Sequence, residues 1–195
     1  MFIAEKGLTD KIETVEVNLR EAEQLGDAFR AINPYCTVPV LEADDGTRMF
    51  STAGCCRYLE EAYPEPPLMG RSPEEKGLVA DLAWRMEIDG FLAVGEALRN
   101  SATGLKDRAL TGPDNYPQIP ELAQRGRQRV GHFFTTLDTI LEGRDYVAGE
   151  SFSIADITAF CAVGFASRLK FELPDGANNA HRWFEAVSAR PSTAL

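Results

Sequence analysis

Two short stretches hold most of the side chains that could take part in chemistry, "PYCTVPVL" at residues 34–41 and "FSTAGCC" at residues 50–56. Outside them the usual catalytic groups are scarce. The chain has only two histidines, His132 and His181, and each stands alone in a stretch with helical periodicity. This argues against a Ser-His-Asp triad and against a zinc site. The sequence therefore identifies no catalytic residue and no metal ligand.

Pro39 stands inside the apolar run of the first stretch. Because proline has no N–H to donate to a sheet, it belongs at the start or the edge of a strand, or at a cis peptide bond. An ordinary strand start is one interpretation. In the other, a cis Val38–Pro39 bond turns the main chain of Val38 outward, where its N–H and C=O pair with an extended peptide ligand.

The second stretch places Ser51 and Thr52 where a predicted strand ends and a predicted helix begins. The free N–H groups and the positive end of the helix dipole at such a position attract a carboxylate. A peptide-binding edge at Val38 beside an anion-binding helix start at Thr52 predicts a site for a small acidic peptide.

The cysteines have neither the spacing of metal ligands nor the density of a disulfide scaffold. They are Cys36, Cys55, Cys56 and Cys161. This usage indicates a reduced, cytoplasmic compartment. We interpret Cys36 as an inert structural thiol, and Cys55 and Cys56 as small buried hydrophobes on a helix.

The overall charge argues against nucleic acid as a partner. The chain of 195 residues has a formal net charge of -10, so its surface repels phosphates. We interpret the short basic run "QRGRQRV" as the solvent-exposed face of a helix. No apolar run reaches the roughly 18 residues that a membrane span requires. The sequence therefore predicts neither a nucleic-acid partner nor a membrane segment.

Residues 1–64 alternate between helical and strand patterns. The spacing of apolar residues predicts, in order, a short helix ending at Gly7, a strand over "TVEVN", a helix over residues 20–32, a hairpin over residues 37–50 and a helix over residues 52–63. The chain begins inside the first of these helices, without a capping residue ahead of it.

The remainder of the chain predicts helices only. Residues 65–72 form a Pro-rich linker, and residues 73–195 an all-helical domain. Ser72 with Glu75, and Ser153 with Asp156, each have the spacing of a capping box at a helix start. Loss of the Asp156 cap is expected to cost roughly 0.5–2 kcal/mol of stability.

Three segments in this order, "NPYCTVPVL", "DGTRMFSTAGCCRYLEEAYP" and "GESFSIADI", resemble the glutathione transferases, and the similarity extends over nearly the whole chain. The resemblance implies an α+β fold, with a thioredoxin-like N-terminal domain followed by an all-α C-terminal domain. It also implies a two-fold homodimer of the bacterial, cytosolic type, with glutathione as co-substrate.

The resemblance assigns the acidic peptide site to glutathione. By position, the main chain of Val38 before cis-Pro39 binds the cysteinyl part, and Thr37 reaches the glycyl carboxylate. Ser51 and Thr52 hold the γ-glutamyl end. Ser51 replaces an acidic residue that is usual in the family, so a charge-assisted bond to the ligand's ammonium is lost and binding should be weaker.

An acidic group from the partner subunit is one possible compensation for Ser51, and Glu87 is a candidate. The family's first strand and the loop with its catalytic Ser, Tyr or Cys are expected ahead of Met1, so the catalytic residue stays unassigned. The face with Trp84, Phe91 and Leu98 is open to two interpretations, the second-substrate pocket or packing in the core or dimer.

The resemblance predicts an enzyme of detoxification, which conjugates the glutathione thiolate to small hydrophobic electrophiles. Two alternatives remain open. One is a non-catalytic protein of the same fold that binds ligands or partners, and the other is a glutathione-dependent disulfide reductase or isomerase. The helix over residues 52–63 and the first helix after Ser72 are expected to form the dimer interface.

Overall fold

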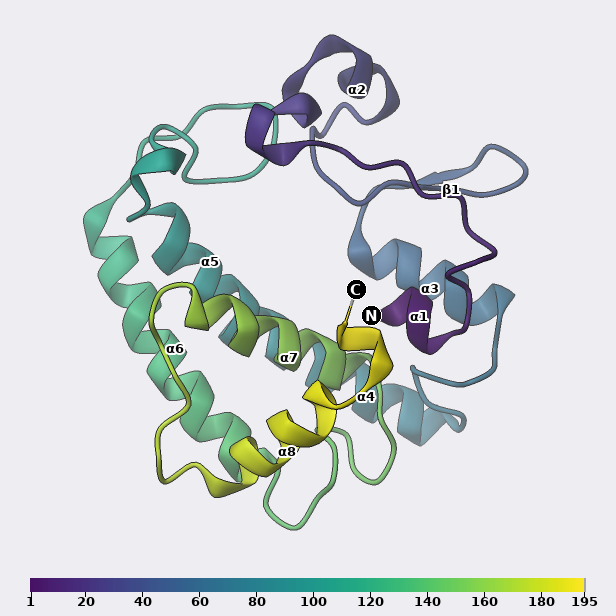
Figure 1. The fold of residues 1–195 in the computed structure, drawn as a ribbon, viewed down its shortest axis with the longest axis vertical. Helices are drawn as coiled ribbons and strands as arrows, with labels where there is room; N and C mark the ends of the chain where they lie inside the picture. Colours follow the sequence, from purple (N-terminus) through teal and green to yellow (C-terminus); the bar gives the residue numbers. More distant parts are fainter. Residues whose placement is uncertain (195) are drawn as a thin grey trace.

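The computed structural model describes residues 1–194. Figure 1 shows a small N-terminal part, in purple and blue, beside a larger group of helices in teal, green and yellow. The N-terminal part is a mixed α+β unit. Its elements are α1 (Phe2–Glu5), η1 (Leu19–Glu21), η2 (Glu23–Leu25), α2 (Asp27–Ile32), β1 (Leu41–Glu42), β2 (Arg48–Met49) and α3 (Thr52–Ala62).

The C-terminal part is built from helices, as predicted. They are α4 (Pro73–Arg85), η3 (Met86–Phe91), α5 (Leu92–Arg99), η4 (Thr103–Leu105), α6 (Pro120–Ile140), α7 (Ile154–Ser167), α8 (Asn178–Ser188) and η5 (Pro191–Thr193). The segments α4, η3 and α5 follow one another without a break, and α6 and α7 pack along them (Figure 1). No helix within residues 1–194 is long and apolar enough to cross a membrane.

The predicted hairpin is confirmed. Strands β1 and β2 pair antiparallel, with Leu41 opposite Met49. The turn between them closes where the Gly46 N–H donates to the Ala43 carbonyl, and Gly46 has a φ of +84°, which favours glycine. The Asp45 carboxylate accepts from the Thr47 N–H at 2.8 Å and so holds the tip of the hairpin.

The predicted strand over "TVEVN" is wrong. Residues 14–18 have no regular secondary structure and belong to no sheet, and the Val15 side chain is 80% exposed. A strand is stable only when a neighbour accepts its main-chain hydrogen bonds, and no segment within residues 1–194 pairs with this one. The β-branched composition alone therefore did not produce a strand.

The predicted single helix over residues 20–32 is also wrong. It is broken into η1, η2 and α2, with Ala22 in the left-handed region at a φ of +57°. Only Phe29 of the predicted apolar face is buried, and Ile32 remains exposed. Because short helices gain most of their stability from a packed face, this segment lacks the contacts that would extend it.

The long helical run from α4 to α5 starts and bends for local reasons. Ser72 and Glu75 form the predicted capping box at its beginning. Its middle, η3, is π-helical and passes close to α6. A Cβ atom on Gly90 would lie 2.6 Å from the Phe133 ring, so only glycine allows this approach. The Arg129 guanidinium of α6 donates to the Ile88 carbonyl of η3.

A buried carboxylate organises the C-terminal helices. Asp156 and Ser153 form the predicted capping box of α7, which is confirmed. The same carboxylate also accepts from the Val147 N–H at 2.8 Å and from the Trp183 indole N–H at 2.9 Å. Burial raises the pKa of Asp156, while these hydrogen bonds act in the opposite direction. Asp156 thus ties the loop before α7 and helix α8 to the start of α7.

Two neighbouring residues of the first helix attach the N-terminal part. The Lys6 ammonium, buried between α1 and α3, lies 2.6 Å from Glu60 and donates to the carbonyls of Tyr63 and Pro66. The Glu5 carboxylate lies 2.6 Å from Arg190, near the end of the chain. This contact with Arg190 lowers the pKa of Glu5, against the opposing effect of burial. The two pairs hold α1 against α3 and the C-terminal segment.

Replacing Asp156 by Ala should destabilise the fold by roughly 3 kcal/mol. Besides the helix cap, the variant loses the acceptor of two further hydrogen bonds, from the Val147 N–H and the Trp183 indole N–H. Both donors are then left buried without an acceptor. The measurement is chemical denaturation followed by tryptophan fluorescence. Ser153→Ala is the control, because it removes only the hydroxyl of the cap and should cost about 1 kcal/mol. Equal losses in the two variants would show that the additional bonds contribute nothing.

Candidate functional site

The loop between α2 and β1 contains three of the predicted site residues, Thr37, Val38 and Pro39. The Val38–Pro39 peptide bond is cis. The Val38 side chain is 40% exposed, and no hydrogen bond within residues 1–194 involves its main-chain N–H or C=O. The cis bond agrees with the second interpretation of Pro39, and the main chain of Val38 is free for an extended ligand, whose binding there stays a prediction.

Asn33, which the sequence analysis did not single out, positions this loop. Its side chain is fully buried. The amide nitrogen donates to the Thr37 carbonyl at 2.7 Å, and the amide oxygen accepts from the Tyr35 N–H at 3.0 Å. Between these contacts Cys36 has a φ of +53°. The Asn-Pro dipeptide at residues 33–34 is a turn signal that could have identified this residue.

The other two predicted residues lie at the start of α3. Ser51 is the N-cap, and its hydroxyl oxygen accepts from the Gly54 N–H at 3.1 Å. Ser51 and Thr52 are both exposed. The N–H groups of Thr52 and Ala53 have no hydrogen-bond partner within the described chain. This end of α3 therefore presents free N–H groups and the positive end of its dipole to solvent.

The hairpin brings the two groups of residues to the same place. In the register of β1 and β2, Leu41 lies opposite Met49. In an antiparallel hairpin the start of the first strand and the end of the second lie at the same end, and Val38 and Pro39 precede β1 while Ser51 and Thr52 follow β2. The free main chain of Val38 and the start of α3 thus lie at one end of the hairpin.

The thiols near this site are structural. Cys36, Cys55 and Cys56 are all buried and form no disulfide. Burial raises the pKa of Cys55, and it raises the pKa of Cys56 to about 12. The Cys55 and Cys56 thiols therefore remain protonated and unreactive at neutral pH. Within the described residues no group of His, Cys, Asp and Glu side chains is arranged to hold a metal ion.

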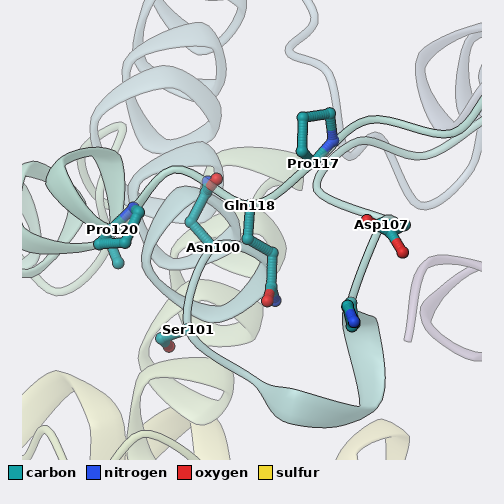
Figure 2. A pocket seen from close by; sticks show the side chains of 8 residues that line it. Asn100, Ser101, Asp107, Pro117, Gln118 and Pro120 are labelled. Atoms are coloured by element: carbon teal, nitrogen blue, oxygen red, sulfur yellow. The ribbon is translucent and has the colours of Figure 1, made fainter.

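A separate cavity of about 590 Å³ lies where α5 ends and α6 begins (Figure 2). Its polar wall includes Gln118, whose amide donates at 2.8 Å to the carbonyls of Arg99 and Ala102. Figure 2 shows Asn100 and Gln118 from neighbouring segments beside this hollow. None of the five residues predicted to bind the acidic peptide lines it, so the cavity is distinct from that site.

Comparisons with known proteins agree with this architecture. Residues 1–62 match the family model for the glutathione S-transferase N-terminal domain, and residues 102–191 match the one for the C-terminal domain. The chain is 33% identical over 191 residues to glutathione S-transferase 2 of Saccharomyces cerevisiae, covering 97% of this chain and 79% of that protein. The chain belongs to the glutathione S-transferase family. The predicted domain boundary at residues 65–72 lies between the two matched ranges and stays a prediction.

Solved glutathione transferases have the same fold. The structure of Gtt2 from Saccharomyces cerevisiae is 31% identical, with a TM-score of 0.87, covering 99% of this chain and 90% of that one. A glutathione S-transferase domain-containing protein of Marinobacter aquaeolei is 34% identical, with a TM-score of 0.89, covering 98% and 91%. The chain therefore has the transferase fold, a thioredoxin-like N-terminal domain followed by a helical one. Glutathione is the co-substrate of this family.

The residues predicted to face a second substrate lie on the run from α4 to α5. Trp84 is 65% exposed, whereas Phe91 and Leu98 are half-buried. The Phe91 ring meets the Phe165 ring of α7 edge-on, with centroids 5.4 Å apart. Glu87, the predicted acidic group for a partner subunit, is half-buried in η3. The roles of these residues stay predictions.

Replacing Asn33 by Ala should destabilise the protein by roughly 2–3 kcal/mol, because the Tyr35 N–H and the Thr37 carbonyl lose a buried partner. Asn18→Ala is a matched control. Asn18 also accepts two main-chain N–H bonds, but it is exposed, and its loss should cost at most about 1 kcal/mol. Urea denaturation measures both. Similar losses would show that Asn33 does not support the loop.

Proposed function

We propose that this chain binds glutathione at the end of the β1–β2 hairpin and conjugates its thiolate to small hydrophobic electrophiles. The observation that carries the proposal is the juxtaposition, in a member of this family, of the unpaired main chain of Val38 with the free N–H groups of α3. A tripeptide with two carboxylates needs both a main-chain edge and an anion site.

Each part of glutathione has a partner in this arrangement. The main chain of Val38, next to Pro39, pairs with the cysteinyl residue. The Thr37 hydroxyl, whose oxygen accepts from Asn33 at 3.4 Å, keeps its own proton to donate to the glycyl carboxylate. The γ-glutamyl carboxylate binds the hydroxyls and N–H groups at Ser51 and Thr52, assisted by the α3 dipole.

The chemistry is nucleophilic attack by the glutathione thiolate. The thiolate is the reactive form, and a hydrogen-bond donor that stabilises it raises its concentration at neutral pH. The chain contributes by fixing the tripeptide so that its sulfur faces the apolar surface of the α4–α5 run. Phe91 and Leu98 supply apolar contacts there for the electrophile, and we assign no residue as the thiolate-stabilising donor.

The assembly we propose is a two-fold homodimer through α3 and α4. Tyr58 of α3 and Leu78 and Trp84 of α4 expose large apolar side chains. Exposed large apolar side chains are typical of an interaction site where they adjoin, and a two-fold axis buries the same surface of both subunits. We further propose a role in detoxification in the cytoplasm of a bacterium, where the four cysteines remain free thiols.

The test of function measures glutathione binding by calorimetry and conjugation to a dinitro-substituted aryl chloride by the absorbance of the thioether product. Binding with saturable turnover is the expected result. Binding without turnover would support a non-catalytic ligand-binding protein, and turnover only with disulfides would support a reductase or isomerase. Absence of glutathione binding would contradict the proposed site itself.

Replacing Ser51 by Asp should tighten glutathione binding roughly tenfold. Aspartate is as good an N-cap as serine, so α3 keeps its start, and the carboxylate adds a charge-assisted bond to the ligand's ammonium. Calorimetry on wild type, Ser51→Asp and Ser51→Ala measures the effect. The alanine variant should bind more weakly than wild type and lose about 1 kcal/mol of stability.

Ser151→Asp is the control for net charge, since Ser151 is an exposed residue outside the hairpin end. It should leave the affinity for glutathione unchanged. If Ser51→Asp binds no more tightly than wild type, Ser51 does not face the γ-glutamyl ammonium.

A further inference from the structure

The π-helical segment η3 interrupts an otherwise α-helical run, and the structure secures it from the α6 side. Gly90 gives room to Phe133, and Arg129 donates to the Ile88 carbonyl. A π segment inside a long helix shifts the following residues around the axis and occurs frequently at functional sites. The face of η3 that points away from α6 is therefore a candidate functional surface.

Glu87 lies in this segment and has no partner of its own. Its side chain is half-buried, and no hydrogen bond or ion pair within residues 1–194 involves its carboxylate. Burial raises the pKa of Glu87. Burial raises the pKa of the Cys161 thiol of α7, and the charge of Glu87 adds to this effect. Glu87 lies four residues, about one helical turn, before Phe91, whose ring meets Phe165 of α7, so the two residues share the face of η3 toward α7.

An aromatic pair and two glycines with open space in front of them lie on the same side of the helices as Glu87. The ring of Phe91, four residues after Glu87, meets the ring of Phe165 of α7 edge-on. Gly95 continues this face on α5, and Gly164 lies beside Phe165 on α7. A Cβ atom built on either glycine would have no neighbouring atom within 4 Å, so open space lies on both sides of the aromatic pair.

We propose that the surface formed by Glu87, Phe91 and Phe165 between η3–α5 and α7 binds an ammonium group carried by an aromatic or apolar body, with Glu87 as the counter-charge. A partly buried carboxylate without a partner gains a charge-assisted hydrogen bond from such a cation. The neighbouring Phe91 ring adds attraction for a cation and contact area for the apolar body. The Arg168 guanidinium already lies over the ring of Phe165, 4.7 Å from the ring centroid. The ammonium group of the ligand is therefore expected beside Glu87 and Phe91, and not over Phe165.

The proposal deepens the proposed function and rests on it for its biological meaning, because a ligand on this surface would be the second substrate. It names that substrate's class as electrophiles that also carry an amine. Binding itself requires neither glutathione nor turnover, so the two proposals can fail separately.

The experiment compares two naphthalene probes by calorimetry, 1-naphthylmethylamine, which is a cation at neutral pH, and the neutral 1-naphthylmethanol. Wild type should bind the amine at least about tenfold more tightly. In Glu87→Gln the two probes should bind equally. Asp89→Asn is the matched control, because Asp89 is an exposed carboxylate of the same segment, and it should keep the preference for the amine.

Gly164→Leu tests the location independently. A leucine there fills the open space, and both probes should lose affinity while the unfolding midpoint remains that of wild type. Equal binding of the two probes to wild type, a preference that survives Glu87→Gln, or full binding to Gly164→Leu would each overturn the proposal. Glutathione binding measured on the same samples reports separately on the proposed function.

Discussion

The buried carboxylate of Asp156 is the interaction on which the helical part depends. A charge inside a protein is tolerated only when hydrogen bonds replace its water, and here two main-chain N–H groups and the Trp183 indole do so. The carboxylate needs these donors, and each donor is itself buried and needs the carboxylate as its acceptor. The start of α7 is thereby fixed relative to α8, and α7 in turn packs on the η3 segment that presents Glu87.

The candidate site depends on a different kind of constraint. The antiparallel pairing of a very short hairpin brings the residues before β1, Val38 and Pro39, and those after β2, Ser51 and Thr52, to the same end of the hairpin. A single buried side chain, Asn33, satisfies the polar groups of the loop before the hairpin. The binding groups are then mostly main-chain N–H and C=O groups, whose positions depend on backbone geometry more than on side-chain identity.

Sequence patterns predicted the structure correctly where the interaction joins residues that are close together in the chain. The capping boxes of Ser72 and Ser153 connect residues three apart, and the hairpin turn at Gly46 closes over a few residues. The two failures concern segments whose structure needs a distant partner. "TVEVN" has strand composition but no neighbouring strand, and residues 20–32 have helical spacing but bury little beyond Phe29.

The sequence by itself determined the order of the two structural parts, the capped helix starts and the hairpin, because turn and cap preferences act over a few neighbouring residues. The five residues proposed to bind glutathione came from the resemblance of the sequence to a family. Only the tertiary structure showed that Asp156 also anchors Trp183, that Asn33 supports the loop before the hairpin, and that Glu87 is half-buried in a π-helical segment without a partner within residues 1–194. The burial and the hydrogen-bond partners of these groups come from segments far away in the chain, and no local pattern encodes which distant donors will meet a given side chain.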